Sequence, residues 1–204
     1  MKIVCVGRNY VAHIEEMKNE MPSEPVFFMK PASSLLKENL PFHIPPWSSS
    51  LHHEIELVLR ICRTGKEIPL RHAGRYFREI GLGIDFTARD VQQELSEKGL
   101  PWEKAKAFDE SAALGTRFLP KANFADLKSI GFRLEINGKT VQQGMSGLMI
   151  FDFEAILVHL SKYVTLKPGD LIYTGTPAGV GPVHPGDHLE GYIGEEKLMD
   201  FRIQ

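Results

Sequence analysis

The sequence predicts a sheet-dominated α+β fold, because short strand-like segments outnumber helical ones and no regular βαβ series appears. Two observations carry this prediction: the alternating segment Glu54–Ile61 and the hairpin signal Asn137-Gly138. Hydrophobic residues make up 43% of the 204 residues, which is enough for one substantial core. No linker, low-complexity tract or internal repeat divides the chain, so we expect a single domain over residues 1–204.

In the N-terminal part, strand and helix signals alternate with loops. Lys2–Val6 is a short apolar run typical of a strand, and residues 9–18 have helical character. Prolines and serines are frequent in residues 22–46, which predicts loops with short extended pieces. Glu54–Ile61 reads EIELVLRI, and this alternation predicts a strand with apolar side chains on one face.

The middle of the chain predicts two helices separated by a short strand. A helix is expected from Pro69 to about Glu79, because proline favours the first turn of a helix. An apolar run, Leu82–Phe86, follows as a strand. A second helix is expected from Thr87, as its N-cap, to about Lys98, with Asp90 as capping partner and Gly99 as the stop.

The C-terminal part predicts a hairpin, one amphipathic helix and two turns. Arg133–Gln143 contains Asn137-Gly138, the pair most typical of a tight hairpin. Asp152 to about Tyr163 spaces its apolar residues as one face of a helix. Pro168-Gly169-Asp170 and Pro185-Gly186-Asp187 are turns, and each leads into an expected strand.

The charge and cysteine content exclude several classes of protein. A net charge of -2 gives no general attraction for nucleic acid or an anionic membrane surface, and no apolar stretch is long enough to span a membrane. Cys5 and Cys62 are far apart and outside any CxxC motif, which favours two free thiols in a reducing compartment. A disulfide between them stays an open alternative. We therefore expect a cytoplasmic protein.

The pair Glu54-x-Glu56 is the sharpest local feature. On a strand both carboxylates face the same side, and a divalent cation would relieve their repulsion. Oxygen ligands favour Mg²⁺, Mn²⁺ or Ca²⁺ over zinc. A solvated strand face remains the more common explanation of such a pair alone. Asp85, at the end of an apolar run, is a candidate third ligand; His52 shares the face of Glu54, whereas His53 points the other way and is interpreted as structural.

Three further features have both a functional and a structural interpretation. His13 and Glu16 lie three residues apart on the first helix. They are either an oriented general base or a surface pair, and the spacing alone favours the surface pair. Lys106 either holds a substrate carboxylate or faces solvent. The glycine-rich segment 175–181 lacks the ending of a phosphate-binding loop, and either approaches a ligand closely or is a plain loop.

A series of short motifs runs in one order over almost the whole chain. The stretches are Val6–Tyr10 with His13, Phe27–Pro31 with Ser33-Ser34, His53–Leu57, Asp85–Asp90, Gly99–Trp102 with Lys106, Asn137-Gly138, and Gly169-Asp170 with Thr174–Gly181. Together they resemble the fumarylacetoacetate hydrolase family, most closely its small acylpyruvate hydrolase and oxaloacetate decarboxylase members. The resemblance implies a mixed β-roll, usually assembled as a homodimer.

The same resemblance implies roles for individual residues. The metal, Mg²⁺ with Mn²⁺ or Ca²⁺ as alternatives, would be held by Glu54, Glu56 and Asp85. The catalytic group would comprise His13, Glu16 and Lys106, with a mobile helix carrying the first two. The substrate would be lined by Arg89, Gln92 and Thr176. The segment Met145–Met149 departs from the Glu or Asp and Thr usual in relatives, which concerns substrate choice rather than metal binding.

The activity implied is hydrolysis of the C–C bond of acylpyruvates, decarboxylation of oxaloacetate, or both, through an enolate that the metal stabilises. The partner expected is a small 2-oxo acid. Isomerisation or tautomerisation of a 2-hydroxy-dienoate or of oxaloacetate is one alternative. A non-catalytic binding protein on the same fold is another, made less attractive by the presence of both the three acids and the His13–Glu16 pair.

Overall fold

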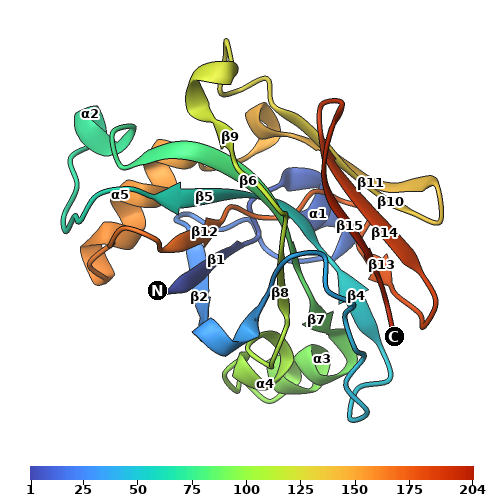
Figure 1. The fold of residues 1–204 in the computed structure, drawn as a ribbon. Coiled ribbons are helices and arrows are strands. Elements are labelled where there is room, and N and C mark those ends of the chain that lie inside the picture. The colour runs from blue at the N-terminus through green and yellow to red at the C-terminus, as the bar shows by residue number, and fades with distance from the viewer.

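The computed structural model describes residues 1–204 and contains three β-sheets and five α-helices, which confirms the sheet-dominated α+β prediction (Figure 1). The largest sheet has the strand order β2-β1-β12-β5-β6-β8-β3, and β9 also pairs with β6. Its strands are β1 (Ile3–Gly7), β2 (Val26–Lys30), β3 (Leu35–Leu36), β5 (Ile55–Ile61), β6 (Phe77–Asp85), β8 (Ala112–Leu114), β9 (Leu119–Pro120) and β12 (Leu171–Tyr173).

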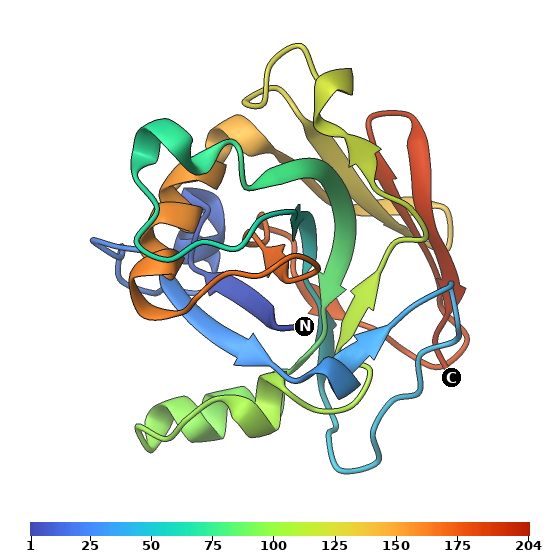
Figure 2. The ribbon, with the colours of Figure 1, turned by 60° about the vertical axis from the view of Figure 1, so that its left-hand side comes forward.

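This large sheet curls so that its two end strands approach each other. The strands at the ends of the order, β2 and β3, are neighbours in the chain, joined only through the short 3₁₀ turn Ala32–Ser34. A flat sheet of this width could not bring them so close, so the sheet must coil around its apolar interior. Figure 2 shows β2 and β3 following one another across the lower edge of the roll.

Two smaller sheets complete the strand structure. One has the order β11-β10-β14-β15 and lies on the right in Figure 1; the other has the order β13-β4-β7. Asn137 and Gly138 both have positive φ, 53° and 75°, at the turn between β10 and β11, which confirms the predicted hairpin. The strands are β4 (Leu51–His53), β7 (Thr87–Ala88), β10 (Gly131–Ile136), β11 (Lys139–Met145), β13 (Gly181–Pro182), β14 (His188–Ile193) and β15 (Glu196–Arg202).

The helices lie around the sheets, and none of them is long and apolar enough to cross a membrane. They are α1 (Val11–Glu16), α2 (Leu70–Ala73), α3 (Arg89–Glu97), α4 (Glu103–Lys106) and α5 (Phe153–Tyr163). The predicted α5 is confirmed: the Asp152 carboxylate caps it by accepting a hydrogen bond from the Ala155 amide at 2.9 Å. Its predicted inner face is buried, namely Phe153, Ile156, Leu157 and Leu160. Cys5 and Cys62 are free.

The helix predicted from Pro69 to Glu79 is wrong in its second half. α2 ends at Ala73, and β6 begins at Phe77. Phe77 and Ile80 are buried because this segment pairs with β5, with Ile80 opposite Leu59. Pairing with a long central strand therefore overrides the local helical preference of the segment.

The predicted capping role of Thr87 is also wrong. α3 begins at Arg89 after Ala88, and no side chain caps it. Thr87 is buried in β7, where its hydroxyl accepts a hydrogen bond from Lys106 Nζ. Asp90 instead accepts hydrogen bonds from the hydroxyls of Ser48 and Ser49. The predicted stop at Gly99 is confirmed, since that residue has a φ of 63° directly after the helix.

Candidate active site

Three carboxylates converge where β5 and β6 run side by side. Ile55 pairs with Ile84, so Glu54 stands opposite Asp85, and the Asp85 amide donates to the Glu54 carbonyl at 2.9 Å. Glu56, two residues along, points to the same side as Glu54, and all three line one cavity. Their side chains are buried and offer oxygens within 4.8 Å of one another, a grouping that could hold a metal ion.

The ammonium group of Lys106 lies between two of these acids. Its Nζ is 2.8 Å from Glu54 Oε2 and 2.8 Å from Asp85 Oδ2. Burial alone would lower the pKa of Lys106, but Asp85 and Glu54 outweigh it and raise that pKa. Burial would likewise raise the pKa of Glu54, yet Lys106 and Arg89 hold it well below its usual range. Both groups are therefore charged.

Glu56 has a different environment. Its carboxylate accepts one hydrogen bond from the Gly175 amide, at 2.7 Å, and makes no ion pair. Burial, with Asp85 next to it, raises the pKa of Glu56 well above its ordinary value. Gly175 has a φ of 105°, and a Cβ there would lie 2.7 Å from Asn9 Cβ, so only glycine brings this amide so close.

These residues fit a hard divalent cation. The donor set is all oxygen, and it is buried and convergent. Glu56 lacks the cation that would stabilise its charged form, and Asp85 Oδ1 has no hydrogen-bond partner although Lys30 Nζ is 2.7 Å away. A bound cation would satisfy both oxygens and lower the cost of burying three acids together.

Of the predicted His13–Glu16 pair on α1, His13 lines the same cavity, and Glu16 contacts it from behind. His13 Nδ1 is 3.3 Å from Glu16 Oε2, and the imidazole is buried. The Gly179 amide donates to Glu16 at 3.1 Å, so the glycine-rich loop holds the carboxylate that contacts the histidine. The segment predicted to be either a ligand loop or a plain loop thus contacts two acids of the site through its backbone amides.

The three residues expected to line the substrate also reach the cavity. Arg89 donates from Nη2 to Glu54 and from Nη1 to Gln92. The Thr176 hydroxyl accepts from Gln142 Nε2 at 2.9 Å, and Gln142 in turn accepts from the Ile55 amide at 3.0 Å. The cavity has a volume of about 390 Å³ and is also lined by Val6, Gly7, Arg8, Met17, Asn19, Phe28, Gln93, Ser96 and Trp102.

Sequence reasoning missed several residues that support the site. Lys30 is fully buried, and its ammonium contacts Asp85 and the carbonyl of Ser111 at 3.0 Å. Gln142 also accepts a hydrogen bond from His53 Nδ1 at 2.8 Å, which gives His53 a structural role. His52 lies against Ser50 Oγ and does not line the cavity. Lys30 lies within one of the recognised motifs, but nothing in the pattern indicates the acid it would contact.

The segment Met145–Met149, noted as a departure from relatives, does not line the cavity. It runs from the end of β11 through a 3₁₀ turn, and the side chains of Met145 and Leu148 are exposed. Ser146 is buried and holds the segment through a hydrogen bond to the Ile130 amide at 3.0 Å. Within this chain, the segment therefore makes no direct contribution to the shape of the cavity.

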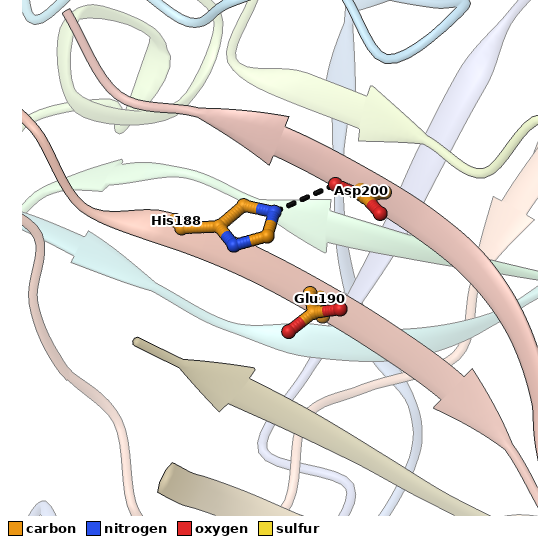
Figure 3. A group of neighbouring side chains, drawn as sticks. All are labelled: His188, Glu190 and Asp200. Atoms are coloured by element: carbon orange, nitrogen blue, oxygen red, sulfur yellow. Dashed lines mark hydrogen bonds and ion pairs between the residues drawn. The ribbon is translucent and has the colours of Figure 1, made fainter. Parts of the chain in front are cut away.

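A second group of possible ligands lies on the outer four-stranded sheet (Figure 3). His188 Nε2 is 2.6 Å from Asp200 Oδ1, and Glu190 lies beside them. Lys197 Nζ is 2.8 Å from both Glu190 Oε1 and Asp200 Oδ2. Lys197 thus already offsets part of the negative charge of this group, whereas Glu56 in the cavity makes no ion pair.

Comparison with known proteins decides the family. The family model described as fumarylacetoacetate (FAA) hydrolase C-terminal matches residues 2–204. The chain belongs to the fumarylacetoacetate hydrolase family. It is 42% identical to the oxaloacetate tautomerase FAHD1 of Mus musculus, a mitochondrial protein, over 99% of this chain and 91% of the relative. It is 43% identical to the mitochondrial oxaloacetate decarboxylase of Dictyostelium discoideum, over 99% and 93%.

A solved structure of the family is also close to this chain. The fumarylpyruvate hydrolase of Pseudomonas aeruginosa, in complex with Mn²⁺ and pyruvate, superimposes with a TM-score of 0.92 at 36% identity. The match covers 100% of this chain and 89% of that one. The expected roll of the fumarylacetoacetate hydrolase family is therefore confirmed for this chain.

Proposed function

We propose that this protein is a divalent-metal-dependent enzyme that hydrolyses the C–C bond of acylpyruvates and decarboxylates oxaloacetate. One observation carries the proposal: three buried carboxylates, Glu54, Glu56 and Asp85, share a cavity with His13, whose imidazole contacts Glu16. The acids fit a cation, and the pair fits a general base. A relative that decarboxylates oxaloacetate and a solved fumarylpyruvate hydrolase support the substrate class.

The metal would be held by Glu54, Glu56 and Asp85, and would supply Lewis-acid stabilisation of negative charge on the oxygens of a 2-oxo acid. His13 Nδ1 faces Glu16, which leaves Nε2 to take a proton from the water that attacks the acyl carbonyl. The carboxylate of Glu16 keeps the imidazole oriented.

The cationic side chains of the cavity would hold the anionic substrate. The Lys106 ammonium, already beside Glu54 and Asp85, would balance charge that develops during bond cleavage. Arg89 and Gln92 contact each other in the first turn of α3, and with Thr176 they offer hydrogen-bond donors to the substrate. Decarboxylation of oxaloacetate needs the same charge stabilisation but no attacking water.

Tautomerisation of oxaloacetate is the second candidate. The similarity to an oxaloacetate tautomerase, 42% over nearly the whole chain, favours it specifically. The same site would serve, because moving a proton between carbon and oxygen needs a base such as His13 and stabilised negative charge, but no bond cleavage.

The deciding experiment follows three products with the metal omitted and restored. Acetylpyruvate and oxaloacetate are supplied to the protein after EDTA treatment, and then with Mg²⁺, Mn²⁺ or Ca²⁺ added. Pyruvate release that returns with the metal supports the proposal. Exchange between the keto and enol forms of oxaloacetate, with the carbon skeleton intact, supports the tautomerase instead. No turnover of any 2-oxo acid despite metal binding would overturn both.

We further propose that the chain acts as one catalytic domain, with Mg²⁺ as its metal, as a homodimer in the cytoplasm. The continuous family match over residues 2–204 supports the single domain. Size-exclusion chromatography with light scattering tests the dimer: a mass near 46 kDa, twice the 23.0 kDa of the chain, is expected. A mass near 23 kDa at micromolar concentration would contradict it.

A further inference from the structure

Arg8 is a cation of the cavity that has no partner. It follows β1 directly, lines the cavity, and makes no hydrogen bond or ion pair with any other residue through its guanidinium. The other arginine and lysine of the cavity, Arg89 and Lys106, are both paired with Glu54. The donors of Arg8 are therefore free for a ligand.

The backbone of Arg8 lies in the left-handed region, with a φ of 57°. Residues other than glycine rarely adopt this conformation, because the Cβ atom crowds the following carbonyl. The neighbouring Asn9 side chain holds the segment, since its amide donates to the carbonyls of Phe151 at 3.0 Å and Thr174 at 2.8 Å. Strain that the surrounding structure enforces in this way is characteristic of binding sites.

The proposed function leaves one end of the substrate unassigned. The carboxylate and 2-oxo group of an acylpyruvate would lie at the metal acids, among cations that are already paired. A cavity of about 390 Å³ falls within the range that accommodates extended organic ligands, so there is room for an acyl chain beyond the reacting carbons. A free guanidinium in that cavity suits a planar carboxylate, which it can bind through two parallel hydrogen bonds.

We propose that Arg8 binds a second carboxylate, at the far end of the acyl chain, so that the preferred substrates are dianionic 2,4-dioxo acids. This inference rests on the proposed function and names the substrate class of the same site. Arg8 is thus a specificity-determining residue that contacts the substrate away from the reacting bond.

The test compares two substrates that differ only at that end. Succinylpyruvate carries the second carboxylate, and 4-methylpentanoylpyruvate replaces it with an uncharged isopropyl group of similar size. Arg8→Gln is expected to lower kcat/KM for succinylpyruvate on the order of 50-fold and to change it less than about threefold for the isopropyl analogue. Arg8→Lys should retain part of the preference, because it keeps the charge but not the paired geometry.

Two further measurements separate this role from a structural one. Arg8→Gly relieves the left-handed strain, so its Tm should be no lower than that of the wild type while its preference for succinylpyruvate is lost. Oxalate, which is too short to reach a second carboxylate site, should bind each variant in calorimetry with Mg²⁺ as tightly as it binds the wild type.

An equal loss for both substrates, or no loss for succinylpyruvate, would overturn the role of Arg8 while leaving the proposed function intact. A wild-type protein that turns over neither substrate would overturn the proposed function itself. Wild-type protein that cleaves both analogues with equal kcat/KM would also overturn the preference for dianions.

Discussion

Two groups of three possible metal ligands occur in this molecule, and they differ in how far neighbouring residues offset the negative charge of their carboxylates. Both place their ligand atoms within 4.8 Å. In the outer group, Lys197 contacts Glu190 and Asp200, and the side chains are partly exposed (Figure 3). In the cavity, Glu56 is buried with only a backbone amide as its partner.

The comparison shows that the number of acids does not define a metal site. Water and Lys197 already stabilise the exposed group, so a divalent cation would have to displace an ion pair for little gain. In the cavity, burial raises the pKa of Glu56 because its charged form lacks compensation. A cation bound there would supply that compensation, which is why we assign the metal to the buried group.

Replacing one acid in each group gives the largest expected contrast. Glu56→Gln keeps an oxygen to accept from Gly175 but removes a charge from the metal site. We expect kcat for pyruvate release from acetylpyruvate to fall on the order of 10²- to 10³-fold. Glu190→Gln, the matched change on the outer sheet, should stay within about twofold of wild type, because that pair is exposed.

The same Glu56→Gln variant, although less active, should be at least as stable to heat as the wild type. Without metal, Glu56→Gln removes a buried carboxyl that lacks a cation, so its Tm should be at or above that of the wild type. A loss of activity accompanied by a large drop in Tm would instead indicate that Glu56 is needed for folding. Equal activities of the two glutamine variants would contradict the assignment of the metal to the cavity.

The two His–carboxylate pairs offer the second contrast. His13→Ala should lower acylpyruvate cleavage about 10²- to 10⁴-fold, because no other histidine lines the cavity. Decarboxylation of oxaloacetate should fall much less, since it needs no attacking water. His188→Ala removes the histidine of the outer pair and should leave both rates unchanged. Equal losses of both rates in His13→Ala would contradict this division of roles.

Much of the site could be predicted from sequence because its residues occupy positions with strong local signals. Alternation along β5 places Glu54 and Glu56 on one face, and Asp85 ends an apolar run, as predicted. The register that sets Asp85 beside Glu54 could not be predicted, since it depends on pairing between strands that are distant in the chain. The convergence of the three acids therefore required the structure.

The wrong prediction for Thr87 and two features that the sequence analysis did not foresee depend on contacts beyond the local sequence. Thr87 has the chemistry of a helix cap, but its hydroxyl is used by Lys106, 19 residues away. Lys30 is a common surface residue type, yet the curl of the sheet buries it against Asp85. Arg8 carries a left-handed backbone that no local sequence signal predicts in a non-glycine residue.

Metal-dependent stability gives a smaller contrast between the groups. Mg²⁺ at about 100 times its Kd should stabilise the native state by about 2.7 kcal/mol, or raise Tm by about 5–10 °C in a chain of this size. Asp85→Asn should abolish that rise, and Asp200→Asn should preserve it. Differential scanning fluorimetry with EDTA and with added Mg²⁺ measures both. A rise that survives Asp85→Asn would place the cation elsewhere.

The smallest effect expected is the acid dependence of the outer group. His188 and Lys197 hold the pKa of Asp200 below its ordinary value of 3.8, so the native state binds fewer protons there than the unfolded chain. The stabilisation is therefore present above that value and is lost as the pH falls through the lowered pKa.

Because the side chain is 42% exposed, Asp200→Asn should lower Tm by no more than about 2 °C at pH 7. Thermal unfolding is measured from pH 7 to about pH 2.5. The difference in Tm between the wild type and Asp200→Asn should disappear in acid, and at pH 7 it should become smaller in about 1 M NaCl, which screens the ion pairs. A difference that grows in acid would mean that Asp200 stabilises the fold through its protonated form.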